Sequence, residues 1–215
     1  MSPAQPADLE NADESMKWTT EISPLLKEYE LRKNIVIPRV NKFDETSSKK
    51  FVEEMAKAHN SGQPVIPVII DSYGGQVYSL MSMIAAIQDS EVPVATIVEG
   101  KAMSCGAILF SFGKEGYRFM DPNSTVMIHD VSSMEHGKVE ELKASAEEAE
   151  RLNQIVYKMM ARNCGKKSDY FLKMVHKRGH ADWFLDAEEA KKHNLANHLR
   201  LPKLHVTVSV DIDFE

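Results

Sequence analysis

Two different spacings of apolar residues, one typical of strands and one typical of helices, alternate along the middle of the chain. Short β-branched runs bounded by turn residues predict strands, and apolar residues at helical spacing between them predict helices. The predicted strands cover 34–40, 64–71, 92–100 and 124–131. The helices between them cover 45–62, 76–88 and 104–112. Because strand and helix alternate, we expect an α/β fold with a mostly parallel central sheet.

Helical spacing dominates after residue 137. A long helix is predicted over 138–163, a second over 168–178, and a third from Asp186, where Glu189 completes a capping-box pattern. The residues of the long helix expected to face inward are Leu142, Ala149, Leu152, Ile155, Val156, Met159 and Met160. This helix is longer than one face of a small α/β domain requires. We therefore expect its outer end to be buried in a partner.

The flanks of the chain differ from its middle. The start is acidic and rich in proline and alanine, which predicts a partly disordered segment over 1–33. The main domain is expected over 34–200. After it, 201–215 alternates apolar and polar residues, the pattern of an extra strand.

Composition excludes several classes of protein. The net charge of −6 argues against nucleic acid as the main partner. No apolar run approaches the length of a membrane span, and the first residues lack the pattern of a signal peptide. Two cysteines make no disulfide framework, so we expect a cytoplasmic protein.

A serine lies where the third predicted strand gives way to an apolar helix. Ser104 has the small residues Ala102 and Gly106 nearby, which would let a substrate approach. Amides in a first helical turn, such as that of Cys105, have no intrahelical partner and could face an oxyanion. An ordinary helix N-cap is the alternative, and this window alone favours it.

Two glycines mark a second junction of strand and helix. Gly74 and Gly75 would let the backbone approach a ligand closely and present free amides. Neither of the phosphate-loop patterns, G-x-x-x-x-G-K-[ST] or G-x-G-x-x-G, is present, which disfavours a phosphate site. A simple tight turn stays open as an interpretation.

A histidine and an aspartate complete the candidate chemistry. His129 ends a predicted strand and is the natural base for a nucleophilic serine, although a core histidine is the alternative. Its neighbour Asp130 is badly placed to orient the ring, because successive strand side chains face opposite ways. The expected acid is Asp182, which precedes an apolar triplet.

These windows together resemble the ClpP family, the proteolytic subunits of the Clp protease, which are serine peptidases of the crotonase-like fold. The likeness extends from about Asn34 to Leu199. The matching blocks are 72–77 (SYGGQV), 100–107 (GKAMSCGA), 122–129 (PNSTVMIH) and 181–190 (ADWFLDAEEA). The resemblance implies a spiral of βαβ units with a projecting handle helix over about 138–163.

The resemblance also implies roles for the site residues. Ser104 would be the nucleophile, His129 the general base and Asp182 the acid that orients it. The backbone amides of Gly75 and Cys105 would form the oxyanion hole. A substrate polypeptide would lie as an added strand along the residues Gly75, Gln76, Val77 and Ser132. The family uses no metal or cofactor, so none is expected.

Assembly is implied as well, with departures from the family pattern. Family members form heptameric rings that stack in pairs into tetradecamers and receive substrates from an AAA+ ATPase. Here Tyr73 replaces a proline, Asp130 follows the base, and Ala181 stands where the family often has an arginine that couples rings. The spacing from His129 to Asp182 is slightly stretched. The N-terminal region has no clear match to the loops that meet the ATPase.

Other functions remain as alternatives. A non-catalytic ring subunit is one, although the Ser, His and Asp set argues against it. Another hydrolase using the same serine is a second, but the α/β-hydrolase order places the histidine last. Acyl-CoA chemistry on the crotonase-like fold would leave this set unexplained. A zinc site at His176 and His180 is disfavoured, because Gly179 lies between them and the H-E-x-x-H pattern is absent.

Overall fold

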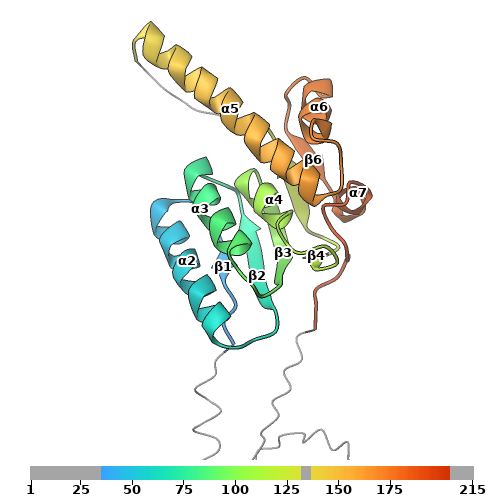
Figure 1. The fold of residues 1–215 in the computed structure, drawn as a ribbon. Coiled ribbons are helices and arrows are strands. Elements are labelled where there is room, and N and C mark those ends of the chain that lie inside the picture. The colour runs from blue at the N-terminus through green and yellow to red at the C-terminus, as the bar shows by residue number, and fades with distance from the viewer. Residues whose placement is uncertain (1–34, 132–136, 204–215) are drawn as a thin grey trace, which may run out of the picture. The chain divides into compact units, whose positions relative to one another are not determined.

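Six strands form one sheet in the part of the chain that the computed structural model describes, residues 35–131 and 137–203 (Figure 1). The strands are β1 (Arg39–Val40), β2 (Ile66–Ser72), β3 (Val94–Met103), β4 (Arg118–Met120), β5 (Thr125–Ile128) and β6 (Trp183–Leu185). The predicted N-terminal segment 1–33 lies outside the described residues, and so does the predicted C-terminal extension 201–215 except for residues 201–203.

The strand order is β1-β2-β3-β5-β6, and β4 also pairs with β3. Pairing is parallel throughout, except between β5 and β6. The long strand β3 has two partners on one edge, β4 along Thr96–Val98 and β5 along Lys101–Met103. The predicted α/β class with a mostly parallel sheet, consistent with a ClpP-like fold, is confirmed.

The helices cover the sheet and extend beyond it (Figure 1). They are α2 (Glu45–Asn60), α3 (Val77–Gln88), α4 (Cys105–Phe110), α5 (Val139–Asn163), α6 (Tyr170–Lys177) and α7 (Ala187–Lys192). Helices α2, α3 and α4 lie side by side over one face, and α6 packs against α5. The predicted N-cap of the last helix is confirmed, because the Asp186 carboxylate accepts a 2.8 Å hydrogen bond from the Glu189 amide.

Strand boundaries differ from the predicted ones. β1 is two residues long instead of 34–40, and β3 continues past residue 100 to Met103 because its end pairs with β5. The strands β4 and β6 were not predicted, since three residues are too few to show a period. Arg118 anchors β4, where its buried guanidinium donates to the carbonyls of Gly113, Asn163, Asn194 and Leu195.

Only the C-terminal half of α5 packs against the body of the protein. Leu152, Val156 and Met160 are buried as predicted, whereas Ala149, Ile155 and Met159 are partly exposed. The prediction that Leu142 faces inward is wrong within this chain, because Leu142 is 40 % exposed and Val139 is 66 % exposed. The helix projects past the sheet, and none of the other helices and strands in residues 35–131 and 137–203 covers this end (Figure 1).

One buried histidine makes the stability of the fold depend on pH. His193 packs edge-on against Trp183 and shares a 2.7 Å hydrogen bond with the Tyr170 hydroxyl through Nδ1. Burial, with a smaller contribution from the Lys166 charge, lowers the pKa of His193 below its usual 6.5. As the pH falls below about 6.5, the unfolded chain therefore binds a proton more readily than the folded one.

We expect the free energy of unfolding to decrease as the pH falls from about 7 toward the lowered pKa of His193. Urea denaturation at several pH values measures it. In His193→Gln the slope over this window should become shallower, whatever the change in stability at pH 7. An unchanged slope would show that His193 titrates alike in both states.

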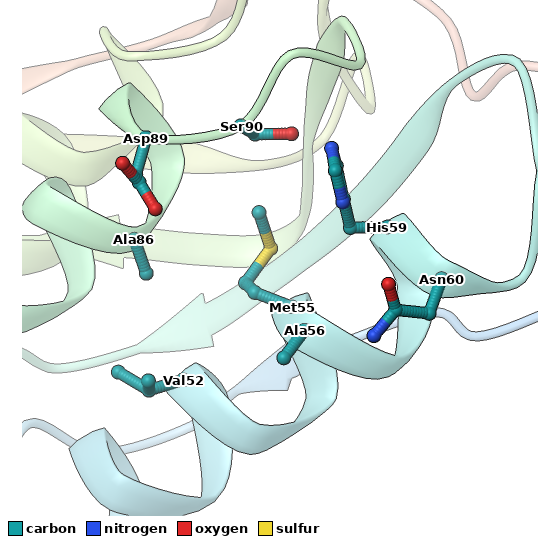
Figure 2. A pocket seen from close by; sticks show the side chains of 8 residues that line it. All are labelled: Val52, Met55, Ala56, His59, Asn60, Ala86, Asp89 and Ser90. Atoms are coloured by element: carbon teal, nitrogen blue, oxygen red, sulfur yellow. The ribbon is translucent and has the colours of Figure 1, made fainter.

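A shallow pocket of about 230 Å³ opens between α2 and α3 (Figure 2). Its lining residues are Val52, Met55, Ala56, His59, Asn60, Ala86, Asp89 and Ser90. None of the residues expected to carry chemistry lines it.

Among the described residues, no helix is both long enough and apolar enough to cross a membrane.

Candidate active site

Ser104 occupies a sharp, strained turn between β3 and α4. Its φ of 55° and ψ of −118° lie outside the regions that L-residues ordinarily adopt, at a cost of about 1–3 kcal/mol. The turn is held because the Ser104 amide donates a 2.8 Å hydrogen bond to the Met127 carbonyl on β5. Strain of this kind persists where the surrounding structure fixes it, and it is common at functional sites.

The Ser104 hydroxyl does not act as a helix cap. It makes no capping hydrogen bond to the amides of α4, so the interpretation as an ordinary N-cap is wrong. Instead its Oγ lies 2.9 Å from Nε2 of His129. This is the distance at which an imidazole accepts the proton of a hydroxyl nucleophile.

The antiparallel pairing of β5 and β6 brings Asp182 to the same place. Ile128, the last residue of β5, lies opposite Trp183, the first residue of β6. His129, just after β5, and Asp182, just before β6, are therefore neighbours. Nδ1 of His129 is 3.4 Å from Oδ1 of Asp182, an ion-pair distance slightly longer than a good hydrogen bond. The structure thus brings together Ser104, His129 and Asp182, the three residues expected from the sequence to act as nucleophile, base and acid.

The two glycines lie directly beside the serine. A Cβ added at Gly74 would come 2.8 Å from Cβ of Ser104, and one added at Gly75 would come 2.4 Å from the Phe43 carbonyl oxygen. Both have positive φ, 105° and 150°. Glycine is therefore required at both positions, by backbone conformation and by space.

Cys105 holds the glycine segment against α4. Its buried thiol lies 3.2 Å from the Gly75 carbonyl and donates to it. Burial raises the pKa of Cys105 to about 11, which leaves almost no thiolate at neutral pH. Cys105 is thus a structural neighbour of Ser104 and is poorly suited to be a nucleophile.

We expect neither cysteine to react with iodoacetamide in the folded protein at neutral pH. Cys164 is also buried, and burial raises its pKa to about 11 as well. Peptide mass spectrometry should find both thiols unmodified in buffer and both alkylated after denaturation. Rapid alkylation of Cys105 in the folded protein, with loss of activity, would contradict this assignment.

The amides expected to bind an oxyanion are both available. No amide hydrogen bond from Gly75 or Cys105 reaches another of the described residues. The amide of the next residue, Gln76, donates a 2.7 Å hydrogen bond to the Phe43 carbonyl. This bond holds the chain just before α3, which starts at Val77. The predicted substrate-binding residue Ser132 lies outside the described residues.

Sequence reasoning missed the partners of Asp130. Its Oδ2 lies 2.5 Å from Nδ1 of His180, and its Oδ1 accepts a hydrogen bond from the buried Tyr157 hydroxyl at 3.3 Å. The acidic side chain beside the base therefore has partners of its own. The only sequence signal for this arrangement was the acidic residue directly after the histidine.

Tyr73, which stands in place of a proline, also has a defined role. Its exposed ring lies beneath the ammonium group of Lys101, 4.3 Å from Nζ to the ring centroid. Lys101 forms an ion pair with Asp71 at 2.7 Å, and this pairing raises the pKa of Lys101. These contacts stabilise the segment just before the glycines.

Comparison with known proteins identifies the family of the chain. The family model described as Clp protease matches residues 15–200. The ATP-dependent Clp protease proteolytic subunit 1 of Rhodopirellula baltica is 33 % identical over 136 residues, 63 % of this chain. The protein of the same name from Salinibacter ruber is 30 % identical over 141 residues, 66 % of this chain. In both cases the match spans 58 % of the relative's own length. The chain is a member of the Clp protease family.

Proposed function

We propose that this chain is a serine endopeptidase that hydrolyses unfolded polypeptides or short peptides through an acyl-enzyme. The observation that carries the proposal is the 2.9 Å contact between the Ser104 hydroxyl and Nε2 of His129. A strained serine, a base within reach and an acid behind the base form the arrangement that acyl transfer requires.

The proposed first step forms the acyl-enzyme. Oγ of Ser104 attacks the carbonyl carbon of the scissile peptide bond, and its proton passes to Nε2 of His129. Asp182 stabilises the imidazolium that results. The amides of Gly75 and Cys105 donate to the oxyanion of the tetrahedral intermediate. This intermediate collapses, and the leaving amine takes the proton from His129.

Water completes the proposed cycle. His129 removes a proton from the water molecule, whose oxygen attacks the ester carbonyl of the acyl-enzyme. The second tetrahedral intermediate collapses and releases the peptide acid, and the Ser104 oxygen recovers its proton from His129. The chemistry draws only on side chains and backbone amides of this chain.

The proposed substrate is an extended peptide that adds a strand beside Gly75–Val77 and near Ser132. The backbone of Gly75 supports this, because its carbonyl is held by Cys105 while its amide has no partner among the described residues. Main-chain hydrogen bonds would then give binding with little dependence on side chains. An AAA+ ATPase that supplies unfolded chains is part of the proposal by family membership. A cytoplasmic location is part of it because two cysteines make no disulfide framework.

Hydrolysis of fluorogenic peptides by the purified chain tests the function. We expect turnover of short unstructured peptides without ATP, since cleavage needs only access to Ser104. Absence of hydrolysis from an assembled protein with an intact Ser104 environment would favour the alternative of a non-catalytic ring subunit.

Assembly into a homo-oligomeric ring, of seven subunits by family membership, is a further part of the proposal. The exposed Val139 and Leu142 on the projecting end of α5 support it, because apolar residues on a projecting helix need a partner. We also propose that two rings stack through the projecting ends of their α5 helices. Within each chain, Glu148 on α5 accepts hydrogen bonds from the Tyr78 hydroxyl at 2.6 Å and from the Arg151 guanidinium at 2.7 Å, and the first of these ties α5 to α3.

We expect Leu142→Glu to weaken the assembly, because it places a charge in the proposed contact. Sedimentation velocity should show smaller species than for the wild type at equal concentration. Ala144→Glu is the matched control, since Ala144 is also exposed on α5 but lies on the opposite face. A stable and active wild-type monomer would contradict the ring. A single ring that does not stack would contradict only the stacking.

A further inference from the structure

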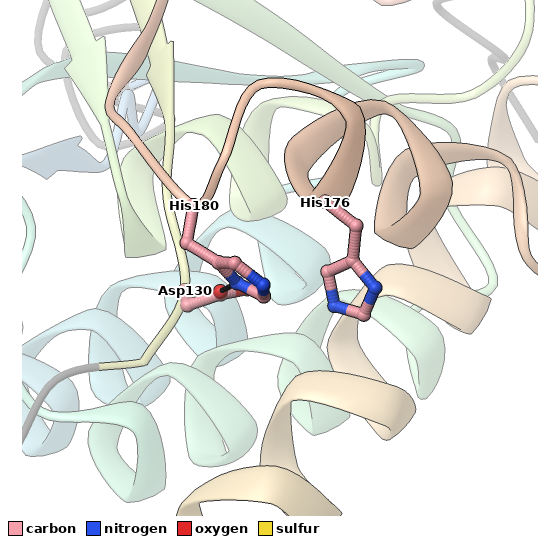
Figure 3. A group of neighbouring side chains, drawn as sticks. All are labelled: Asp130, His176 and His180. Atoms are coloured by element: carbon pink, nitrogen blue, oxygen red, sulfur yellow. Dashed lines mark hydrogen bonds and ion pairs between the residues drawn. The ribbon is translucent and has the colours of Figure 1, made fainter.

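Three potential metal ligands meet on the surface beside the candidate active site. Asp130 follows the end of β5, His176 lies in the last turn of α6, and His180 follows that helix. One ligand atom from each residue lies within 4.8 Å of the other two (Figure 3). The two imidazole rings approach to 4.4 Å between centroids.

The turn after α6 produces this arrangement. The Gly179 amide donates to the His176 carbonyl at 2.9 Å, and the His180 amide donates to the Val175 carbonyl at 3.2 Å. This is the Schellman pattern of a helix end, which requires left-handed backbone at Gly179. The chain reverses there, so the His180 ring returns alongside His176.

His180 itself carries backbone strain. Its φ of 62° places a non-glycine residue in the left-handed region. Histidine is among the residues that enter this region most readily, but the conformation still costs free energy. The hydrogen bond from His180 to Asp130 holds the ring in place. The backbone strain of His180 thus lies at the point where the two imidazoles and the carboxylate meet.

Asp130 is oriented before any ligand arrives. The buried hydroxyl of Tyr157 donates to Oδ1 of Asp130, which leaves Oδ2 in contact with His180. An oriented carboxylate with a second hydrogen bond is typical of metal ligands. The neighbouring cation Arg178 lies over the Trp183 ring, 4.4 Å from its centroid, where it is already engaged.

We propose that Asp130, His176 and His180 bind a divalent transition metal ion of the zinc class. Two imidazoles and one carboxylate are a recurrent donor set for zinc, with water as the fourth ligand. Bond lengths of about 2.0–2.2 Å place tetrahedral ligand atoms roughly 3.4 Å apart. The three ligand atoms already lie within 4.8 Å of one another, and both histidines are exposed to incoming ions. Metal bonds would replace the 2.5 Å contact between His180 and Asp130.

This proposal replaces the sequence-based expectation of no metal. That expectation rested on the family resemblance and on the absence of an H-E-x-x-H pattern at His176 and His180. The third ligand comes from another strand, and only the fold brings it near. The ion would connect the end of β5, which carries His129, to the segment that carries Asp182.

Metal titration of the full chain after treatment with a chelator tests the site. We expect isothermal titration with zinc chloride to give one ion per chain, and cobalt to give the visible absorption of a tetrahedral complex. His176→Ala and His180→Ala should each weaken binding by about tenfold or more. His59→Ala is the matched control, because His59 is an exposed helical histidine remote from the cluster.

Thermal unfolding supplies a readout that does not depend on peptidase activity. Zinc should raise the melting temperature of the wild type and of His59→Ala, and raise it less in His176→Ala. Equal zinc affinity in the wild type and in a His176→Ala, His180→Ala double variant would overturn the proposal. Binding at millimolar zinc only would overturn it as well. Neither outcome bears on whether Ser104 is the nucleophile.

Discussion

Replacement of Ser104 by alanine should abolish peptide hydrolysis, with turnover reduced by about 10⁴-fold or more. The hydroxyl is the only proposed nucleophile, and its 2.9 Å contact with His129 has no substitute in the variant. Cys105 cannot take its place, because its thiol is buried and directed to the Gly75 carbonyl. Fluorogenic peptide cleavage at saturating substrate measures the loss.

The fold should survive this substitution. Alanine also carries a Cβ, so the strained backbone at residue 104 gains no new clash, and no capping hydrogen bond is removed. Circular dichroism and sedimentation should therefore match the wild type. Ser82→Ala, on the exposed face of α3, is the matched control and should retain full activity. A rate near that of the wild type in Ser104→Ala would refute the assignment of the nucleophile.

Replacement of Asp182 by asparagine should lower kcat by about 10³–10⁴-fold. The carboxylate lies 3.4 Å from Nδ1 of His129 and favours the tautomer that leaves Nε2 free to accept the serine proton. An amide has nearly the same shape, but it can donate to Nδ1 and so favours the wrong tautomer. The loss should appear in kcat more than in KM, because substrate does not contact Asp182 in the proposed mechanism.

Asp186→Asn is the matched control for this experiment. Asp186 is the N-cap of α7, and asparagine caps a helix about as well as aspartate does. The variant should keep both its stability and its activity. If Asp186→Asn were the more damaging of the two at equal stability, Asp182 would not be the acid.

The larger elements of the fold were predictable from local pattern. The helices α2, α3 and α5 were predicted with errors of about two residues or less, because their apolar spacing continues over several turns. The strands β4 and β6 were missed, since each has three residues and exists only through its pairing partner. The inward position assigned to Leu142 failed because helical spacing shows an apolar face without showing what covers it.

The candidate site was predictable in composition but only partly in geometry. The family motifs singled out Ser104, His129 and Asp182, and the pairing of β5 with β6 explains how residues so distant in sequence meet. The contacts of Asp130 with Tyr157 and His180 depend on long-range packing, which no local pattern encodes. The same holds for the thiol of Cys105, whose direction follows from the turn at Ser104.

Covalent labelling tests the central claim, that Ser104 is an activated nucleophile. The purified chain is treated with a fluorophosphonate, digested, and mapped by mass spectrometry, with His129→Ala treated in parallel. A single adduct on Ser104 in the wild type, lost or greatly slowed in His129→Ala, is the predicted result. An unlabelled Ser104 in the folded, assembled protein, or an adduct on another residue, would contradict it.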